Sequence, residues 1–537
     1  TKCYGYSSAG NADFIADNWI GNASFENNWT DPVQFGQIMP NYSVPTNFLV
    51  SGGGSWQLKS TSTTLSPFLI GNDNLISTQN DGDQDSVQVA AANGYAIAVW
   101  TSKDTAGYTD IRGRVIALTN GLTVGGGDFL ISTDNADIQR SPKVAASGNR
   151  AIIVWESRYN GSDFDIRGCV IDLVSASPIG GEIAISSFNQ SQQLMPAVAA
   201  DLNQAVVVWA SLDSGPAARI RARSIDMNLG TPLGQNEIQL NSNAYGSPVW
   251  PKVAISEGRA LAIWNIYENA DYDVRGRVVD VSNVATAVGN AEFDLSVDNY
   301  YQQDDYDLAV SGGQGIVTWS TAQSTTSGAR EIRARLVDML VGTPLGLSEF
   351  VLSTIPGSYK AATKVGISGD VAFAVWQSQD FPSLIRGRSI DLTQRVVRGS
   401  SEFLVLSSNA DGCGPNMIMQ GNRALVTCNV HSPSGDFDVV GRVVDISTLV
   451  PLSSADFLIS SSTAGNQWYN QVAVSGEKAI VAWQSNDSGI DYDIRSSVIG
   501  IPGIAIPFVG PLPYGPNNFF TAPLIERNYE ATAQIVK

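Results

Sequence analysis

The sequence has one histidine and four cysteines in 537 residues. The histidine, His431, lies in a polar stretch, so a Ser-His-Asp or Cys-His site would have to use it, and no serine nearby has the surroundings of an activated nucleophile. The same shortage excludes zinc sites of the usual histidine and cysteine type. We therefore predict that the protein is not an enzyme.

Basic residues and long apolar runs are also scarce. The chain has 32 lysines and arginines against 51 acidic residues, a formal charge of -19. Nucleic acids and anionic membranes require a basic surface, so we expect neither as a partner. No apolar run approaches the ~20 residues of a membrane span. An acidic surface of this kind favours a secreted or cell-surface protein.

The sequence contains a repeat of about 55 residues that begins near residue 70. Each copy has an apolar run that ends in a tryptophan, here called the marker tryptophan, and Cys428 takes its place in the seventh copy. A period this regular indicates one supersecondary unit repeated eight times. The markers are Trp100, Trp155, Trp209, Trp264, Trp319, Trp376, Cys428 and Trp483.

Each copy contains four short strand-like runs separated by turn residues. In the second copy we expect strands over 143–146, 150–155, 166–173 and 182–186. No segment has the helical period. The pattern predicts an all-β fold, an eight-bladed β-propeller of four-stranded antiparallel blades over residues 67–501. A β-solenoid is the alternative, although its coils are usually shorter.

The third run of each copy carries a charged pattern. In the first copy it contains Asp110, Arg112 and Arg114, which alternate and therefore lie on one face of a strand. A ligand site would need such arginines in one blade only, whereas these recur throughout. We therefore expect them to neutralise nearby carboxylates and to stack on aromatic side chains between blades.

These motifs resemble a known repeat. Gln139, Pro142, Val144 and Ala145 form a Q-x-x-P-x-V-A motif, followed by the apolar run, an I-x-x-R-x-x-D motif and an E-F-x-L-S-T motif. The combination is similar to the propeller repeats of large secreted and surface-attached bacterial proteins, over about residues 70–501. The resemblance implies the fold and a role in binding or adhesion. The family's I-x-A-Q-R is I-R-G-R or I-R-A-R here, so no ligand residue is transferred.

The two ends of the chain lie outside the repeat. Residues 1–66 are predicted to form an irregular N-terminal arm, and residues 502–537 an apolar, proline-rich C-terminal arm. The C-terminal arm either packs on its own ring or contacts a neighbouring subunit, which would give a homo-oligomer or a surface assembly. Its expected anchors are Tyr514, Phe519 and Phe520. Since no signal peptide is visible at Thr1, we expect the numbering to begin at a mature end or at a fragment boundary.

The eighth copy supplies three strands only. The segment 75–78 matches the fourth-strand motif but has no strands before it. We therefore predict that it completes the eighth blade and closes the ring, which removes exposed sheet edges. The segment 504–509 is a competing donor, although its proline makes it a poorer strand.

The cysteines suggest two disulfides. Cys413 and Cys428 flank a Gly-Asn turn almost symmetrically, so a hairpin would bring them together. Cys3 and Cys169 remain and could tie the N-terminal arm to the second blade. Two bridges would imply an oxidising compartment.

Acidic residues gather in the loops expected on one face of the ring. Asp81, Asp83 and Asp85 alternate as oxygen ligands do in calcium loops, so calcium is a possible ligand there. A solvated acidic turn is the alternative interpretation. No other cofactor is expected.

The sequence favours a non-enzymatic extracellular propeller for adhesion, for binding a glycan or protein ligand, or for building an extracellular structure. The alternative is a carbohydrate-active hydrolase with its carboxylates on the loop face. No specific pair of carboxylates stands out for that chemistry.

Overall fold

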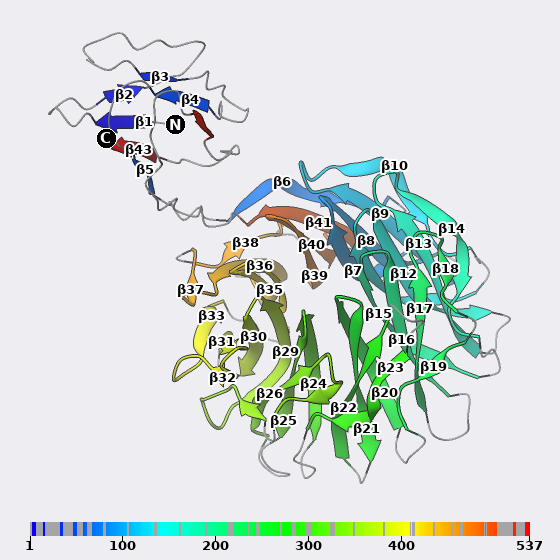
Figure 1. Cartoon of the computed structure of the whole chain (residues 1–537). Helices are drawn as coiled ribbons and strands as arrows, with labels where there is room; N and C mark the ends of the chain where they lie inside the picture. Colours follow the sequence, from blue (N-terminus) through cyan, green and yellow to red (C-terminus); the bar gives the residue numbers. More distant parts are fainter. Residues whose placement is uncertain are drawn as a thin grey trace. The chain divides into compact units, whose positions relative to one another are not determined.

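The computed structural model divides the chain into two compact units, residues 67–501 and residues 1–66 with 502–537. It describes residues 67–501 and the strands of the second unit, and the internal gaps are 79–81, 105–106, 134–136, 160–162, 188–190, 213–217, 235, 243–246, 269–270, 282–285, 297–301, 323–327, 347–348, 380–381, 409, 411–413, 433–434, 454, 462–464, 488 and 490. Figure 1 shows the first unit as a ring of blades.

The first unit is an eight-bladed β-propeller, as predicted. Blades 1 to 4 contain β7 (Gln84–Ala92), β8 (Tyr95–Lys103), β9 (Thr109–Ala117) and β10 (Thr123–Leu130); β11 (Gln139–Ser147), β12 (Arg150–Tyr159), β13 (Asp163–Asp172) and β14 (Ser177–Ala184); β15 (Gln193–Asp201), β16 (Gln204–Ser211), β17 (Arg219–Asp226), β18 (Thr231–Pro232) and β19 (Ile238–Gln239); β20 (Ser247–Ser256), β21 (Arg259–Glu268), β22 (Asp271–Asp280) and β23 (Thr286–Asp294). Blades 5 to 8 contain β24 (Gln303–Ser311), β25 (Gln314–Ala322), β26 (Arg330–Asp338), β27 (Thr343–Pro344) and β28 (Phe350–Val351); β29 (Tyr359–Ser368), β30 (Val371–Gln379), β31 (Ser383–Asp391), β32 (Val396–Val397) and β33 (Phe403–Leu406); β34 (Asn416–Gln420), β35 (Arg423–His431), β36 (Phe437–Asp445), β37 (Val450–Pro451) and β38 (Phe457–Leu458); β39 (Gln467–Ser475), β40 (Lys478–Ser485), β41 (Asp493–Gly500) and β6 (Phe68–Leu75).

The second unit joins strands from both ends of the chain. One sheet has the order β2-β1-β43-β5, in which β1 runs parallel to β43, and a second has the order β3-β4-β42. The strands are β1 (Cys3–Tyr6), β2 (Phe14–Ala16), β3 (Val33–Phe35), β4 (Asn47–Val50), β5 (Gln57–Thr61), β42 (Phe519–Thr521) and β43 (Thr532–Val536).

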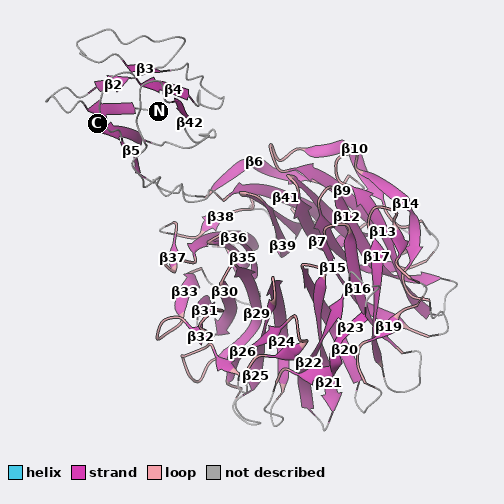
Figure 2. Ribbon diagram, viewed as in Figure 1, coloured by secondary structure: helices cyan, strands magenta, loops and turns pink. Residues whose placement is uncertain are grey.

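Every element of the described residues is a strand (Figure 2). The strands of blade 2 are longer than the sequence suggested, because polar residues at their ends continue the ladders. In blades 3, 5, 6 and 7 the outermost strand is divided into two short pieces. In blade 3 the first piece ends at Pro232, which has no N–H to donate to the ladder.

The core lies between adjacent blades. The second strand of each blade is buried on both faces, as its uninterrupted apolar run predicted. The seven marker tryptophans are fully buried, and Cys428 is buried in the same position. In four blades the indole Nε1 donates to a glutamine at the start of the first strand, at 2.9 Å for Trp155 and Gln139. The other pairs are Trp100–Gln84, Trp209–Gln193 and Trp483–Gln467.

The ring is closed by a strand that precedes the first blade in sequence. Strand β6 pairs antiparallel with β41, and the amides of Ile76 and Ser77 both donate to the carbonyl of Ile494, at 2.8 and 3.3 Å. The Ser77 hydroxyl also donates to Asp493, at 3.1 Å. The eighth blade is therefore closed by a segment that precedes the first blade in sequence, as predicted. The closing strand is Phe68–Leu75, however, and not the predicted 75–78, because the pairing with β41 extends in the N-terminal direction.

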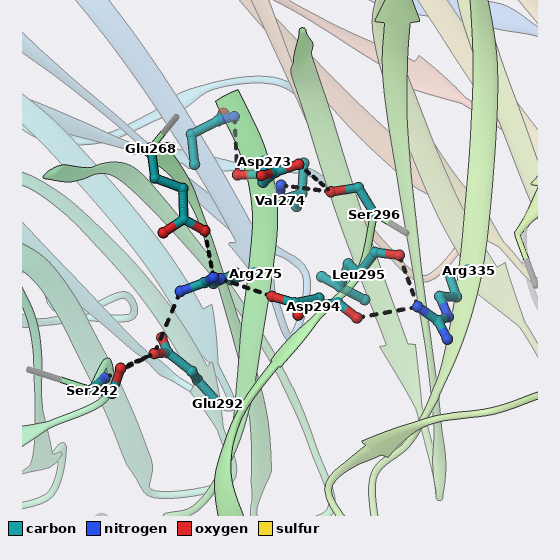
Figure 3. A network of polar contacts seen from close by, with 11 residues as sticks. Ser242, Glu268, Asp273, Val274, Arg275, Glu292, Asp294, Leu295, Ser296 and Arg335 are labelled. Atoms are coloured by element: carbon teal, nitrogen blue, oxygen red, sulfur yellow. Dashed lines mark hydrogen bonds and ion pairs between the residues drawn. The ribbon is translucent and has the colours of Figure 1, made fainter. Parts of the chain in front are cut away.

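The outer part of the ring is held by a repeated polar clasp (Figure 3). In blade 4 the guanidinium of Arg275 lies 3.7 Å from Glu292, and this carboxylate accepts from the amide and the hydroxyl of Ser242 in blade 3, at 3.0 and 2.5 Å. Arg335 of blade 5 donates to the carbonyl of Leu295 at the end of blade 4, at 3.1 Å. Each blade is thus hydrogen-bonded to both neighbours.

The clasp recurs around the ring, including the closing interface. At seven described interfaces a serine or threonine of one blade donates to a carboxylate of the next, through its hydroxyl in five and through its backbone amide in Thr354–Glu402 and Ser461–Asp73. The five hydroxyl pairs are Thr78–Asp128, Thr133–Glu182, Ser187–Glu237, Ser242–Glu292 and Ser407–Asp456. The expectation that the third-strand arginines neutralise carboxylates is confirmed by ion pairs such as Arg112–Asp128 and Arg495–Asp73, whereas their stacking on aromatic side chains stays a prediction.

Candidate functional site

The first strand of seven blades begins with the same β-bulge near the loop face. One residue per bulge is in the left-handed region, with φ between 47° and 58°, and none of the seven is glycine. Non-glycine residues in this region are strained and persist only where the surroundings hold them. The seven positions are Ser86, Ser141, Met195, Trp250, Asp305, Ala362 and Tyr469.

The bulge residues differ in side chain although their backbones are alike. In blade 4 the bulge is held from both sides: the amide of Trp250 donates to the Sδ of Met195 at 3.4 Å, and the Tyr306 hydroxyl donates to the Trp250 carbonyl. The tryptophan side chain remains 52% exposed. The repeated bulge therefore presents six kinds of side chain from seven blades at the mouth of the ring.

An aromatic platform surrounds Trp250. Its ring lies 6.2 Å from Tyr272, which in turn lies 4.9 Å from Tyr267. Tyr267 and Tyr272 face each other across the hairpin of β21 and β22, and Tyr267 is 46% exposed. Large exposed aromatic side chains in contact are typical of a surface that binds another molecule.

A second aromatic group lies at the junction of blades 7 and 8. His431 and Phe437 are 4.1 Å apart, Phe437 lies 4.8 Å from Trp468, and Trp468 lies 5.9 Å from Tyr469. Tyr469 is 66% exposed at its bulge. Since blades 4 and 8 are four apart in a ring of eight, the bulge residues Trp250 and Tyr469 lie on opposite sides of the axis.

Charged side chains lie on the same rim between blades 5 and 6. Arg330 forms an ion pair with Asp304 and lies 5.6 Å from the ring of Tyr359. Burial raises the pKa of Asp304 to about 6, and the neighbouring arginine opposes this shift only in part. Asp305, the next residue, is exposed. The rim thus combines a carboxyl group that titrates near neutral pH with an arginine and exposed aromatic side chains.

A third feature lies two residues further along the first strands, where three blades place a lysine. These are Lys143, Lys252 and Lys364 of blades 2, 4 and 6, and Asp307 has the same position in blade 5. The Nζ of Lys252 lies 3.3 Å from the carboxylate of Asp307. Sequence reasoning missed these lysines, although each lies twelve residues before its marker tryptophan, and alignment of the copies on that tryptophan reveals the column.

The predicted calcium ligands have other roles where they are described. Asp83 accepts a hydrogen bond from the amide of Tyr492 in blade 8, at 3.3 Å, and so contributes to ring closure. Burial raises the pKa of Asp85. Asp81 lies outside the described residues, and within the described part no group of three acidic, histidine or cysteine side chains could hold a metal ion. Calcium binding through all three aspartates stays a prediction.

The described residues do not test either of the two predicted disulfides. Cys169 is a free thiol, 3% exposed in the core between blades 1 and 2, and burial raises its pKa to about 12. The Cys428 thiol lies 3.4 Å from the carbonyl of Asn429. Cys413 and the side chain of Cys3 lie outside the described residues, so both pairings stay predictions.

The predicted assembly anchors also lie outside the described part. Tyr514 is not described, and Phe519 and Phe520 are placed only as residues of β42. Assembly through the arms stays a prediction. In the described part we find no helix with the length and apolar character needed to cross a membrane.

Comparison with known proteins shows no family for this chain. No protein-family model and no curated protein sequence matches the chain. The β-propeller domain of the trilobed protease from Pyrococcus furiosus is 7% identical, with a TM-score of 0.39, over 72% of this chain and 99% of that one. The endosialidase of phage phi92 is 9% identical, with a TM-score of 0.35, over 90% of this chain and 77% of that one. A GH43 endo-arabinanase from Bacillus licheniformis is 14% identical, with a TM-score of 0.27, over 48% of this chain and 95% of that one.

These comparisons correct the prediction that the chain is not an enzyme. The solved structures just named are enzymes or an enzyme's domain. Identities this low assign no activity in return, because one fold serves many functions. The chain is similar to known structures as a β-propeller, and its activity has to be argued from its own side chains.

Proposed function

We propose that this is a secreted or cell-surface protein that binds carbohydrate at the loop-face mouth of the ring. The observation that carries the proposal is the pair of exposed aromatic side chains, Trp250 and Tyr469, at equivalent bulges on opposite sides of the axis. The C–H face of a sugar ring packs on an aromatic face, and sugar hydroxyls hydrogen-bond to charged groups such as those of Asp304 and Arg330.

The mouth has the composition of a ligand site. It places apolar aromatic surface beside a few polar groups, and Asp304 and Arg330 lie on strands of blade 5, where they form an ion pair with each other. Strained bulges hold the aromatic side chains in place before a ligand arrives, which lowers the entropy cost of binding. Aromatic side chains also carry much of the binding energy in recognition surfaces.

The test is binding to a glycan array, followed by titration of the best glycan. Trp250→Ala and Tyr469→Ala should each weaken binding at least about tenfold, since truncation of such an aromatic side chain typically costs over 1.4 kcal/mol. Leu202→Ala is the matched control, because Leu202 is 74% exposed and also has positive φ but lies in a turn on the opposite face. Absence of binding to every glycan, or equal losses in all three variants, would refute the proposal.

A second candidate is glycoside hydrolysis at the same rim. It is favoured by Asp304, a partly buried carboxyl group with a pKa of about 6 beside the exposed Asp305, because a general acid needs a raised pKa and a second carboxylate nearby. The same glycans are incubated with the protein and analysed for cleavage. Turnover that Asp304→Asn abolishes, and that Asp370→Asn in an exposed turn does not, would establish the hydrolase.

A further inference from the structure

Three lysines of the innermost strands form a group that is not part of the carbohydrate site proposed above. Lys143, Lys252 and Lys364, here called the axial lysines, each pair in the β-ladder with the residue just before the marker tryptophan of their blade. They come from alternate blades and lie on the strands that surround the axis (Figure 1). Equivalent positions on radially arranged blades lie at one level along the axis.

Water reaches this level of the ring. All eight equivalent side chains are partly exposed, although they belong to the innermost strands, and the side chain of Lys252 retains 37% exposure. The axis therefore holds an accessible space instead of a sealed apolar core. The eight positions are Gln88, Lys143, Ala197, Lys252, Asp307, Lys364, Asn416 and Gln471.

Positive charge is in excess at this level. Asp307 is the one acidic side chain of the ring of eight, and it already accepts hydrogen bonds from Lys252 at 3.3 Å and from the amide of Val365 at 3.1 Å. Among the described residues neither the ammonium group of Lys143 nor that of Lys364 forms an ion pair or a hydrogen bond. Glu156, the carboxylate that acts on Lys143, is paired with Arg140 at 2.7 Å. Two cations are therefore without a counterion.

This excess of positive charge contrasts with the acidic composition of the whole chain. The protein has a formal charge of -19 and nine lysines, and three of the nine lie at this one level. Burial and the mutual repulsion of the three ammonium groups lower the pKa of Lys143 to about 8. Unpaired cations in a partly buried space are unfavourable for folding alone, so an anion that enters would relieve the repulsion.

We propose that the axial lysines bind the acidic group of an acidic saccharide, a carboxylate, sulfate or phosphate, whose sugar rings rest on the aromatic side chains of the mouth. The inference rests on the proposed carbohydrate-binding function and specifies its substrate class. An ammonium group binds all three anions as a compact charge with several donors. Asp307 fixes Lys252, which leaves Lys143 and Lys364 to meet the ligand.

The experiment is calorimetric titration of the full chain with four probes: sodium sulfate, inorganic phosphate, an oligogalacturonate and its neutral methyl ester. The variants are Lys143→Gln and Lys364→Gln, chosen because neither lysine has a protein partner to leave unpaired. Lys478→Gln is the control, since it removes the same charge from a half-buried lysine of β40 whose described hydrogen bond is to the carbonyl of Thr119, at 3.4 Å.

We expect saturable binding of sulfate or phosphate that each axial variant weakens about tenfold and Lys478→Gln leaves unchanged, because a charge-assisted hydrogen bond contributes about that factor. We also expect the oligogalacturonate to bind at least about tenfold more tightly than its methyl ester. Absence of saturable binding of both small anions, or an equal loss in the control, would overturn the inference.

The two proposals fail separately. If glycans bind without preference for an acidic group and the axial variants bind them normally, the carbohydrate function stands and the axial anion site is wrong. If sulfate binding depends on the axial lysines while no glycan binds, the anion site stands and the carbohydrate function is wrong.

Discussion

The outer edge of the ring and its axis use charge in opposite ways. At the outer edge a carboxylate accepts from a serine or threonine of the neighbouring blade at seven described interfaces, and an arginine forms an ion pair with that carboxylate at six of them. At the axis three lysines occur in three blades only, and two of them have no partner among the described residues. The outer charges are compensated, whereas those at the axis are not.

The difference separates structural from functional residues. A feature that every blade needs for packing on the next blade is repeated in every copy, as the clasp is. A feature that serves a ligand is needed once per ring and therefore breaks the repeat. By this criterion the axial lysines and the aromatic side chains of two bulges are functional, and the third-strand arginines are structural.

Removal of a clasp carboxylate should have the largest effect on stability. Asp456 accepts from Arg442 at 3.0 Å and from the amides of Ser407 and Ser408, at 2.9 and 2.8 Å. Asp456→Ala leaves a largely buried guanidinium without its carboxylate and two amides without an acceptor, so we expect a loss of about 3 kcal/mol in the free energy of unfolding. Guanidinium denaturation measures it. Asp370→Ala in an exposed turn is the control, and equal losses in both would contradict the structural role of the clasp.

Removal of a core glutamine should have a smaller effect. Gln139 accepts the indole N–H of Trp155 at 2.9 Å in a fully buried position. Gln139→Leu leaves that N–H unpaired, and we expect a loss of about 1–2 kcal/mol in the free energy of unfolding. Thermal unfolding of Gln139→Leu and of the double variant Gln139→Leu, Trp155→Phe tests it, because the second change removes the unpaired donor and should recover part of the loss.

Removal of an axial lysine should raise the free energy of unfolding, in contrast to the two substitutions above. The pKa of Lys143 is about 8 in the folded protein against 10.5 for an ordinary lysine, so the folded state binds this proton more weakly than the unfolded state. The lysine therefore lowers stability at pH 7, and this cost disappears as the pH rises from about 8 to 10.5. Allowing for solvent screening, Lys143→Gln should raise the free energy of unfolding by about 1 kcal/mol at pH 7.

Denaturation of the wild type and Lys143→Gln at pH 7, 9 and 10.5 measures this difference. We expect the gap between the two curves to shrink as the pH rises. A gap that widens, or a variant less stable than the wild type at pH 7, would mean that the lysine is compensated within the protein and would remove the contrast with the outer edge.

Truncation of a mouth aromatic should have the smallest effect on stability. Trp250 is 52% exposed, so we expect Trp250→Ala to change the free energy of unfolding by no more than about 0.5 kcal/mol. The same variant should lose glycan binding. A large loss of stability, measured by thermal unfolding, would instead mean that the tryptophan holds the bulge together and belongs with the structural residues.

Much of the fold followed from the sequence because repetition amplifies weak signals. A single strand of four to six residues is ambiguous, but a marker tryptophan at a regular spacing fixes the repeat unit, and Cys428 could be identified as its equivalent from position alone. Ring closure by the segment before blade 1 was predictable because the first and last copies have complementary deficits.

The candidate site was not predictable in the same way. The alternating aspartates predicted a site that includes Asp83, but in the structure Asp83 contributes to ring closure. The sequence pattern gave no indication of Trp250 or Lys143. A residue that breaks a repeat looks like ordinary variation until the strand register shows which position it occupies. Partial burial of a carboxyl such as Asp304, which raises its pKa, likewise depends on neighbours distant in sequence.

The sequence by itself determined the blade, the number of blades and the direction of closure, because those depend on local hydrophobic alternation and on its period. Tertiary structure alone decided which side chains face the axis and whether their charges are compensated. The physical reason is that strands from different blades, some 55 residues or more apart in the chain, converge on one axis, where Lys143, Lys252 and Lys364 act on one another electrostatically.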